Sequence, residues 1–355
     1  MSTMRDGWTE TTLGEIITLE YGKPLKAENR DGKGFPVFGS AGEVGLHSEP
    51  LVNEAPVIVV GRKGTAGAVW WSDLPCSVID TAYYVVQKIE TDIRFLYFTM
   101  GFLDLPSLNA QTGVPGLNRD RAYSTQVLLP PPAEQKRIVD VVSYVDAYID
   151  ALQQQVDTAR AARNAVLHEL IVLPSKHRKK MEDFVFLKRG HDLPTQSRID
   201  GEFPVIASNG TVGWHNERIG PIPGVITGRS GTIGKVLFAT GGYWPLNTTL
   251  YVTEFMGNDE RFAALTLETM RLERFAGGST VPSLDRKVLR NELVFAPPIE
   301  EQKRIVEIVS SMDGVIQSTE QAVVDAKNLR SGLLSGLLSG EHEIPASYDS
   351  LLGAA

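Results

Sequence analysis

The sequence predicts a mixed α/β (α+β) fold, with two globular domains joined by two long antiparallel coiled-coil helices in an internal pseudo-two-fold duplication. Three observations predict it. The string EQKRIV occurs twice, at residues 134–139 and 301–306. Apolar residues recur at spacings of three and four after each copy, and short β-branched runs bounded by Gly or Pro precede each copy. These features indicate two copies of one module, a globular domain followed by a heptad helix.

Length and composition allow two domains of ordinary size. The chain has 355 residues, of which 42% are hydrophobic and 22% are charged, so it can bury a substantial core. Its start, MSTMRDGWTE, lacks a secretory signal, and no apolar run reaches the roughly eighteen residues that span a bilayer. We therefore expect a cytoplasmic protein. The single cysteine, Cys76, cannot form an internal disulfide and is expected in the core.

The net charge favours a local nucleic-acid surface over a general one. The formal net charge is −8, which excludes a protein that is basic over its whole surface. Residues 177–297 carry a slight excess of Lys and Arg, whereas residues 298–355 are acidic. The second globular region therefore permits duplex binding without demonstrating it.

The duplication extends through the globular regions. At the separation that relates the two EQKRIV strings, GRKGTAG from Gly61 matches GRSGTIG from Gly228, DTAYYV from Asp80 matches NTTLYV from Asn247, and VPGLNR from Val114 matches VPSLDR from Val281. One residue further apart, FPVFGSAGEVGLH from Phe35 matches FPVIASNGTVGWH from Phe203. Shared order and near-constant spacing exclude the chance recurrence of short glycine-rich loops.

Each globular region is predicted to mix strands and helices. The runs APVIVVG and TAYYVVQKI are short, β-branched or aromatic, and bounded by Gly or Pro, which favours strands. The segments ETDIRFLYFTMGFL and DERFAALTLETMRLERF have helical spacing instead. The order of strands in the sheets is left open.

A long helix is predicted to begin after Pro132 and another after Pro298. Proline suits the first helical turn, and Glu134 and Glu301 then face the positive end of the helix dipole. The predicted seam residues of the first helix are Ile138, Val142, Val145, Ile149, Leu152, Val156 and Ala159, resuming at Val166 and Leu170. Those of the second are Ile305, Val309, Met312, Ile316, Thr319, Val323 and Ala326, resuming at Leu333 and Leu337. The same interruption, Arg163 and Arg330, occurs in both.

Each helix needs a partner along its length. A helix of about 35 residues rises roughly 50 Å and cannot bury its seam against one small domain. We expect the two copies to pair antiparallel and to carry their domains to opposite ends. A second apolar row widens each stripe and consists of Val141, Leu167, Ile171, Ile308, Leu334 and Leu338. This row packs either on outside subunits or on the chain's own domains, and the sequence leaves both open.

No catalytic constellation is found. The sequence has no GxGxxG after a strand, no GxxxxGK[ST], no HExxH, no GxSxG, and no NPPY or DPPY of amino-methyltransferases. The ExK fragment of metal-dependent nucleases is present in EQK at Glu134 and Glu301, but here it opens a helix. His47 and His215 match between the copies, which favours a shared turn over a metal site. We therefore predict no catalytic residue, no metal and no bound cofactor.

Two α/β domains, each followed by prolines, EQKRIV and a heptad helix, resemble the specificity subunit of a Type I restriction-modification enzyme. The resemblance covers nearly the whole chain and implies two target recognition domains, each reading one half of a split double-stranded DNA target. It also implies helices that act as spacer and dock two modification (methyltransferase) subunits. S-adenosylmethionine is expected on those partner subunits, and ATP-driven restriction (motor-nuclease) subunits as possible further partners. The subunit itself would be non-catalytic.

The resemblance divides the chain into five parts. Target recognition domain 1 is expected at residues 1–132, the central spacer helix at 133–174, target recognition domain 2 at 175–298, the C-terminal spacer helix at 299–340, and an acidic tail at 341–355. The last part is either a flexible tail or a segment that packs back onto the modules. The basic run at residues 176–180 links the modules and could touch phosphates, although a solvated linker is the simpler interpretation.

Base contacts cannot be carried over from the family, because recognition domains diverge. Glycine lets backbone approach DNA, and Arg or Asn can read base edges, so the polar loops that recur in both halves are the candidate DNA-binding residues. In the first half these are Ser40, Arg62, Lys63, Thr65, Thr112, Asn118, Arg119 and Arg121. In the second half they are Ser208, Asn209, Thr211, Arg229, Ser230, Thr232, Thr280, Arg286 and Lys287. Each could instead be a solvated or turn-stabilising residue.

Two other functions are considered beside DNA reading. The acidic total charge is compatible with a coiled-coil assembly scaffold whose globular ends bind protein. The Gly-rich loops could in principle hold a nucleotide in an enzyme, but FGSAG from Phe38 matches IASNG from Ile206, so the copies share a turn and not a phosphate cradle. No base, nucleophile or metal set supports that enzyme.

Overall fold

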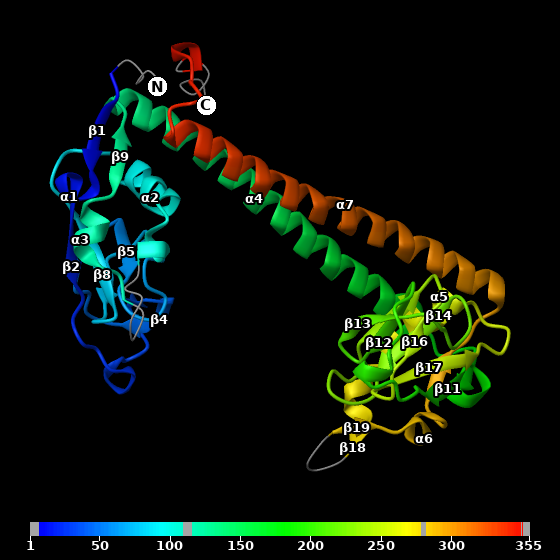
Figure 1. The fold of residues 1–355 in the computed structure, drawn as a ribbon. Coiled ribbons are helices and arrows are strands. Elements are labelled where there is room, and N and C mark those ends of the chain that lie inside the picture. The colour runs from blue at the N-terminus through cyan, green and yellow to red at the C-terminus, as the bar shows by residue number, and fades with distance from the viewer. Residues whose placement is uncertain (1–6, 109–115, 278–281, 349, 351–355) are drawn as a thin grey trace. The chain divides into compact units, whose positions relative to one another are not determined.

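The computed structural model describes residues 7–108, 116–277, 282–348 and 350 (Figure 1). The chain forms two compact units, residues 1–151 with 322–355 and residues 152–321. Each unit contains one globular domain and one part of each long helix. We call the globular parts the first domain and the second domain, and describe each unit by itself.

The first domain contains a four-stranded sheet, a three-stranded sheet and a strand pair. In sheet order, the strands are β2 (Ile17–Tyr21), β8 (Ala82–Gln87), β5 (Val57–Gly61) and β6 (Val69–Ser72); then β4 (Gly42–His47), β3 (Phe35–Gly39) and β7 (Ser77–Val78); and the pair β1 (Thr9–Thr12) and β9 (Gln126–Leu129). Its helices are α1 (Leu13–Ile16), α2 (Ile93–Phe102) and α3 (Arg119–Tyr123). All pairings are antiparallel except β3 with β7.

The second domain repeats both sheets and the strand pair of the first, with the strands in the same order. Its four-stranded sheet is β11 (Phe186–Arg189), β17 (Thr249–Glu254), β14 (Gly224–Gly228) and β15 (Val236–Ala239), and its three-stranded sheet is β13 (Gly210–His215), β12 (Phe203–Ala207) and β16 (Trp244–Pro245). The pair β10 (Arg178–Lys180) with β20 (Leu293–Phe295) and the pair β18 (Ala276–Gly277) with β19 (Ser283–Leu284) complete it, with helices α5 (Glu260–Thr269) and α6 (Arg286–Leu289). The predicted duplication and mixed fold are confirmed.

Buried valine and isoleucine residues explain the central strands. All five residues of β5 are buried, and the equivalent strand β14 is also buried throughout. A strand that lies between two neighbours and is covered on both faces needs a continuous apolar run, not an alternating one. The predicted strand APVIVVG meets this requirement. Cys76 is buried close by, and burial raises the pKa of its thiol to about 11.

The long helices are α4 (Pro132–Leu167), which continues as a π-helical turn at His168–Val172, and α7 (Ile299–Leu338). In the second unit Arg160 pairs with Glu320 and Arg163 with Asp313, so the partner positions descend along α7 as they ascend along α4. The two helices therefore run antiparallel there. In the first unit Arg330 of α7 pairs with Asp146 of α4.

The seam of the paired helices is largely buried. The buried members are Ile138, Val142, Ile149, Leu152 and Val156 in α4, and Ile305, Val309, Ile316, Val323, Ala326 and Leu337 in α7. Part of the second apolar row packs on the chain's own domains and part is exposed. Leu167 and Ile171 belong to the core of the second domain and Leu338 to that of the first unit, whereas Ile308 is 48% exposed. Most of this row therefore packs on the chain's own domains.

A buried glutamine joins each helix to its own domain. The Gln135 side chain accepts a hydrogen bond from the amide of Asp92 (2.9 Å) and donates one to the carbonyl of Pro130 (2.9 Å). The Gln302 side chain likewise accepts from Asp259 (2.9 Å) and donates to Pro297 (2.8 Å). Asp92 and Asp259 are the N-caps of α2 and α5. The glutamine of EQKRIV therefore ties the start of each long helix to the start of a domain helix.

Residues near both ends of the chain meet in the first unit. Trp8 and Ile344 are buried in one cluster with Leu337, and the Trp8 Nε1 donates to Glu134 Oε2 at 3.0 Å. At least the described start of the predicted acidic tail therefore packs back onto the domain. No helix in the described residues is both long and apolar enough to cross a membrane.

Candidate nucleic-acid interface

In the first domain, four segments that are distant in sequence meet at one place. The amides of Arg62 and Lys63 donate to the carbonyl of Thr81 at 2.9 and 3.1 Å, and the amide of Ser40 donates to the Thr81 Oγ1 at 3.3 Å. The amide of Leu117 donates to the carbonyl of Arg62 at 2.9 Å. The loop after β5, the turn after β3, the turn before β8 and the entry to α3 thus form one cluster.

The second domain builds the same cluster from equivalent residues. The amides of Arg229 and Ser230 donate to the carbonyl of Thr248 at 2.8 and 3.2 Å, and the amide of Ser208 donates to the Thr248 Oγ1 at 3.3 Å. The amide of Leu284 donates to the carbonyl of Arg229 at 2.8 Å. The backbone frame of the two clusters is therefore the same, bond for bond.

Glycine is required at the root of each of these loops. A Cβ at Gly61 would lie 2.1 Å from the carbonyl oxygen of Thr65, and one at Gly228 would lie 1.8 Å from that of Thr232. Both distances are far inside van der Waals contact, so any larger residue would push the loop open. The loop folds back tightly on its own strand and presents the residues between its ends to solvent.

The structure gathers many of the predicted DNA-binding residues at these clusters. Those whose backbone bonds or bridges define the clusters are Ser40, Arg62, Lys63, Ser208, Arg229 and Ser230. Those exposed on the adjoining loops and helices are Thr65, Asn118, Arg121, Asn209, Thr211, Thr232 and Lys287. Thr112 and Thr280 lie outside the described residues. A role of each in DNA binding stays a prediction.

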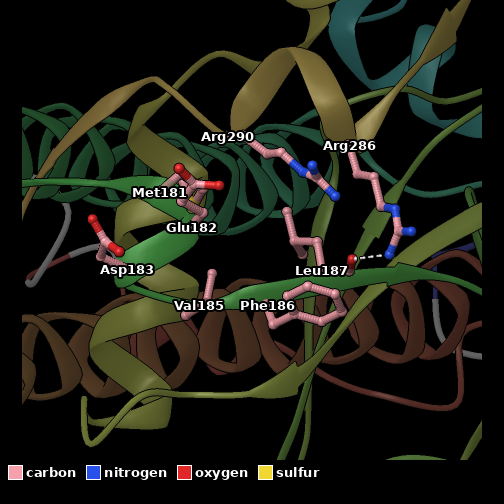
Figure 2. A pocket seen from close by; sticks show the side chains of 8 residues that line it. All are labelled: Met181, Glu182, Asp183, Val185, Phe186, Leu187, Arg286 and Arg290. Atoms are coloured by element: carbon pink, nitrogen blue, oxygen red, sulfur yellow. Dashed lines mark hydrogen bonds between the residues drawn. The ribbon is translucent and has the colours of Figure 1, made fainter.

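Several predicted residues are engaged in holding the turns. The Asn118 Oδ1 accepts the amide of Arg121 at 3.0 Å as the N-cap of α3, and Asp285 accepts the amide of Lys287 in the same way at α6. Arg119 Nη1 donates to the carbonyl of Leu19 at 3.4 Å. Arg286 Nη1 donates to that of Leu187 at 3.0 Å, as Figure 2 shows. These contacts support a turn-stabilising role for Asn118, Arg119 and Arg286.

An aromatic cluster lies beside the loops of the first domain and was missed from the sequence. The rings of Tyr21 and Tyr83 are 5.0 Å apart, and the guanidinium groups of Arg62 and Arg119 each lie 4.9 Å from the Tyr21 centroid. Burial raises the pKa of the Tyr83 hydroxyl, so it stays neutral. The one clue in the sequence is the match between LEYG, which contains Tyr21, and LKRG, which contains Arg189.

A pocket of about 330 Å³ lies next to the cluster of the second domain (Figure 2). Its lining residues are Met181, Glu182, Asp183, Val185, Phe186, Leu187, Arg286 and Arg290. In the first domain the residue that matches Arg290 is Tyr123, whose hydroxyl accepts the amide of Leu19 at 2.9 Å. The two domains therefore differ in how they fill the space between α3 or α6 and the first strand of the sheet. Within the described residues, no cluster of three or more His, Cys, Asp or Glu could hold a metal ion.

Solved structures with the same fold are known. An S subunit of a Type I restriction-modification system from M. genitalium superposes with a TM-score of 0.62 at 16% identity, covering 97% of this chain and 99% of that one. A chain from a structure on complex assembly and conformational transition of the type I R-M system gives a TM-score of 0.64 at 13% identity, covering 95% and 99%. At these identities the likeness concerns the fold.

Curated relatives are similar over parts of their length. A putative type I specificity subunit of Mycoplasma pneumoniae is 24% identical over 225 residues, which are 56% of this chain and 58% of the relative. The specificity subunit of the Type I restriction enzyme MjaVIII of Methanocaldococcus jannaschii is 28% identical over 78 residues, 22% of this chain and 18% of the relative. The chain therefore matches less than two thirds of the length of either.

The model of one protein family matches both halves of the chain. It describes the Type I restriction modification DNA specificity domain and matches residues 5–158 and 173–325. Each match contains one domain with its cluster of loops and the start of the long helix that follows. The chain belongs to this family of Type I restriction-modification specificity subunits, with two target recognition domains.

Proposed function

We propose that this chain is the non-catalytic subunit that reads a bipartite double-stranded DNA target, with one half-site for each domain. The observation that carries the proposal is the pair of loop clusters. They share one backbone frame but present different side chains, as expected if each copy reads its own sequence. The cytoplasm, where DNA is accessible in a bacterium or archaeon, is the proposed location.

The chemistry of the clusters suits duplex DNA. Lys63 and Thr65 are exposed on the tight loop of the first domain, as Thr232 is on that of the second. Small and basic residues on such loops can approach phosphates closely, while arginine can donate two hydrogen bonds to one base edge. Among the described residues, the guanidinium of Arg229 makes no hydrogen bond or ion pair within the protein. Arg229 is therefore the first residue to test.

Replacing Arg229 tests the assignment of one half-site to one domain. In a complex with its methyltransferase subunits, Arg229→Ala should weaken selection of the half-site read by the second domain by about tenfold or more, and leave the other half-site unchanged. Binding selection from randomised duplexes measures both half-sites at once. Equal weakening of both would make Arg229 a phosphate contact. The matched control is Arg62→Ala in the first domain, whose guanidinium is held by the carbonyl of Asp80, and which should leave the half-site of the second domain unchanged.

The paired helices are proposed to set the spacer and to dock two modification subunits, which would carry S-adenosylmethionine. Tyr144, Tyr148 and Leu329 are exposed and line an apolar groove of about 550 Å³ between the helices in the first unit. Exposed apolar patches of this kind are typical of protein interfaces. Restriction subunits would join the same assembly.

Shortening both helices tests the spacer. Deleting one heptad from each helix, in register, should shorten the preferred distance between half-sites while both half-site sequences persist. Methylome sequencing of a host that carries the gene and its methyltransferase partner reads both half-sites and the spacer. An unchanged spacer would contradict the proposed role of the helices.

A protein-assembly scaffold without DNA readout is the second candidate. The net charge of −8 is the observation that favours it. Sequence-selective duplex binding by the complex that weakens with rising salt would exclude it, because displacement of counterions from phosphates makes DNA binding salt-dependent. Binding without any sequence preference would favour it.

A further inference from the structure

The last residue of the first strand in the large sheet differs between the two domains. Tyr21 ends β2 and Arg189 ends β11, and each is followed by a glycine. They pair with equivalent positions of the neighbouring strand, Tyr21 with Tyr83 and Arg189 with Leu250. The two residues therefore occupy the same place in the same frame, beside the loop clusters.

One backbone carbonyl near this place accepts a hydrogen bond from a different arginine in each domain. In the first domain the carbonyl of Asp80 accepts a hydrogen bond from Arg62 Nη1 at 2.7 Å. In the second domain the matching carbonyl, that of Asn247, accepts instead from Arg189 Nε at 3.4 Å. The arginine that lies on this carbonyl thus comes from the loop after β5 in one domain and from the end of the first strand in the other.

Because of this difference, the two domains expose different hydrogen-bond donors to solvent. Arg62 is held by Asp80 and lies against the Tyr21 ring, so its guanidinium is engaged within the protein. Arg189 is exposed, and its bond to the protein uses Nε, which leaves the Nη1 and Nη2 groups side by side for an outside acceptor. Two parallel donors of this kind match the O6 and N7 acceptors of guanine in the major groove.

We infer that the position occupied by Tyr21 and Arg189 determines specificity, and that Arg189 selects a guanine in the half-site read by the second domain. Tyr21 has no pair of donors, so the corresponding base pair in the other half-site is not selected by an arginine at this position. The inference rests on the proposed function and deepens it, since it names the base chosen by one residue.

The side chain of Asn247 helps to hold the arrangement. Its Nδ2 donates to Asp192 Oδ1, which secures the turn whose carbonyl receives Arg189. In the first domain the matching pair is Asp80 and Pro24, neither of which has a side-chain donor, so this bond has no counterpart there. The sequence difference between DTAYYV and NTTLYV is thus linked to the difference between Tyr21 and Arg189.

Substitutions at Arg189 test the inference in the complex with methyltransferase subunits, with binding selected from randomised duplexes. Arg189→Ala should reduce the preference for guanine at one base pair of the second domain's half-site by about ten- to a hundredfold. The remaining base pairs and the other half-site should be selected as before. Arg189→Lys keeps the charge but loses the paired donors, so it should retain overall affinity and lose most of the guanine preference.

A matched control lies on the same strand. Lys188 is exposed and points to the opposite face from Arg189, because successive residues of a strand alternate. Lys188→Ala removes the same charge and should leave the selected sequence unchanged. Because Arg189 is exposed, the thermal unfolding of Arg189→Ala should match that of the unsubstituted complex.

Three results would overturn the inference. Arg189→Ala could weaken binding to all sequences with the motif intact, which would mark a phosphate contact. Arg189→Ala could also leave both the affinity and the selected motif unchanged. Finally, the half-site that the second domain selects in the unsubstituted complex could contain no guanine. If the unsubstituted complex selects no sequence at all, the proposed function itself fails. That failure can be told apart from a failure of the inference, because it is seen in the unsubstituted complex without any variant.

Discussion

The two domains are most alike where the backbone is buried and least alike where side chains face outward. Amides at residues 62 and 229 donate to carbonyls at 81 and 248, and both domains order their strands identically. Yet Tyr21, which is 48% exposed, stands where the other domain has the exposed Arg189. A buried backbone group without a partner is costly, so the frame tolerates little change. Exposed positions carry no such cost, and a duplicated reader can diverge there.

The junctions between domain and helix show a smaller difference of the same kind. Within the described residues, Gln135 bonds to Asp92 and Pro130, whereas Gln302 has an additional partner in the Asn258 Oδ1 at 2.8 Å. Both glutamines are 2% exposed. The second junction is therefore held by a larger buried network, and the consequences of breaking the two should differ.

The largest effect is expected at these glutamines. Gln302→Ala should destabilise the second domain by about 3 kcal/mol and Gln135→Ala the first by about 2 kcal/mol, because buried partners lose their hydrogen bonds. Urea unfolding followed by hydrogen exchange in each domain measures this separately, since a chain of two units need not unfold in one step. Equal losses would show that the Asn258 bond contributes nothing.

The ion pairs between the helices come next. Arg163 bonds to Asp313 and Glu268 and its side chain is 12% exposed, whereas Arg330 bonds to Asp146 and is 27% exposed. Burial opposes the charged form of Arg163, but hydrogen bonds to Glu268 and Asp313 outweigh it and raise its pKa. Arg163→Ala should cost about 2 kcal/mol and Arg330→Ala about 1 kcal/mol. A double-mutant cycle with Asp313→Ala isolates the pair, and a coupling energy near zero would contradict this.

Tyr123 and Arg290 provide a smaller contrast. Tyr123→Phe removes the acceptor of the Leu19 amide and should cost about 1 kcal/mol. Arg290→Ala removes an exposed side chain at a pocket and should change stability by less than about 0.5 kcal/mol. Thermal unfolding of both variants compares them. A larger loss at Arg290 would mean that its guanidinium supports the pocket wall.

The smallest expected effect is a pH dependence confined to the second domain. Burial, and then the charge of Lys188, lowers the pKa of His191, whose equivalent in the first domain is Lys23. Its folded form therefore binds a proton less readily than its unfolded form. This contribution to stability is present above about pH 6.5 and is lost as the pH falls through the folded pKa. Between pH 7 and pH 5 the urea midpoint of the second domain should fall less in His191→Gln than in the unsubstituted chain. An equal fall in both would show that His191 is not the source of the pH dependence.

Much of the architecture was predictable because it is encoded by neighbouring residues. The strand APVIVVG, the helices at residues 93–102 and 260–269, and the long helices after the prolines each follow from patterns within a few residues. The repeat of EQKRIV also predicted the duplication and the family. In the site, the same repeats identified Arg62 and Arg229 as candidate DNA-binding residues, and the structure places both in the loop clusters.

The roles of individual side chains needed the folded chain. The capping bond of Asn118 and the buried bonds of Gln302 were not evident from a motif that indicates only an exposed loop or a helix start. Tyr21 was missed because its partners Tyr83, Arg62 and Arg119 lie far along the chain. Spacing along a chain reports on nearby residues only, whereas these contacts exist because sheet formation brings distant strands together.

The sequence by itself determined that two equal modules exist, where their long helices begin, and which family they belong to, since repetition and periodicity are properties of order along the chain. The tertiary structure decided which strands are neighbours and that Trp8 packs with Ile344. It also decided which arginine donates a hydrogen bond to the backbone carbonyl of residue 80 or of residue 247. These features depend on packing between segments that are distant in sequence, where a contact made by one side chain in one domain is made by a different side chain in the other.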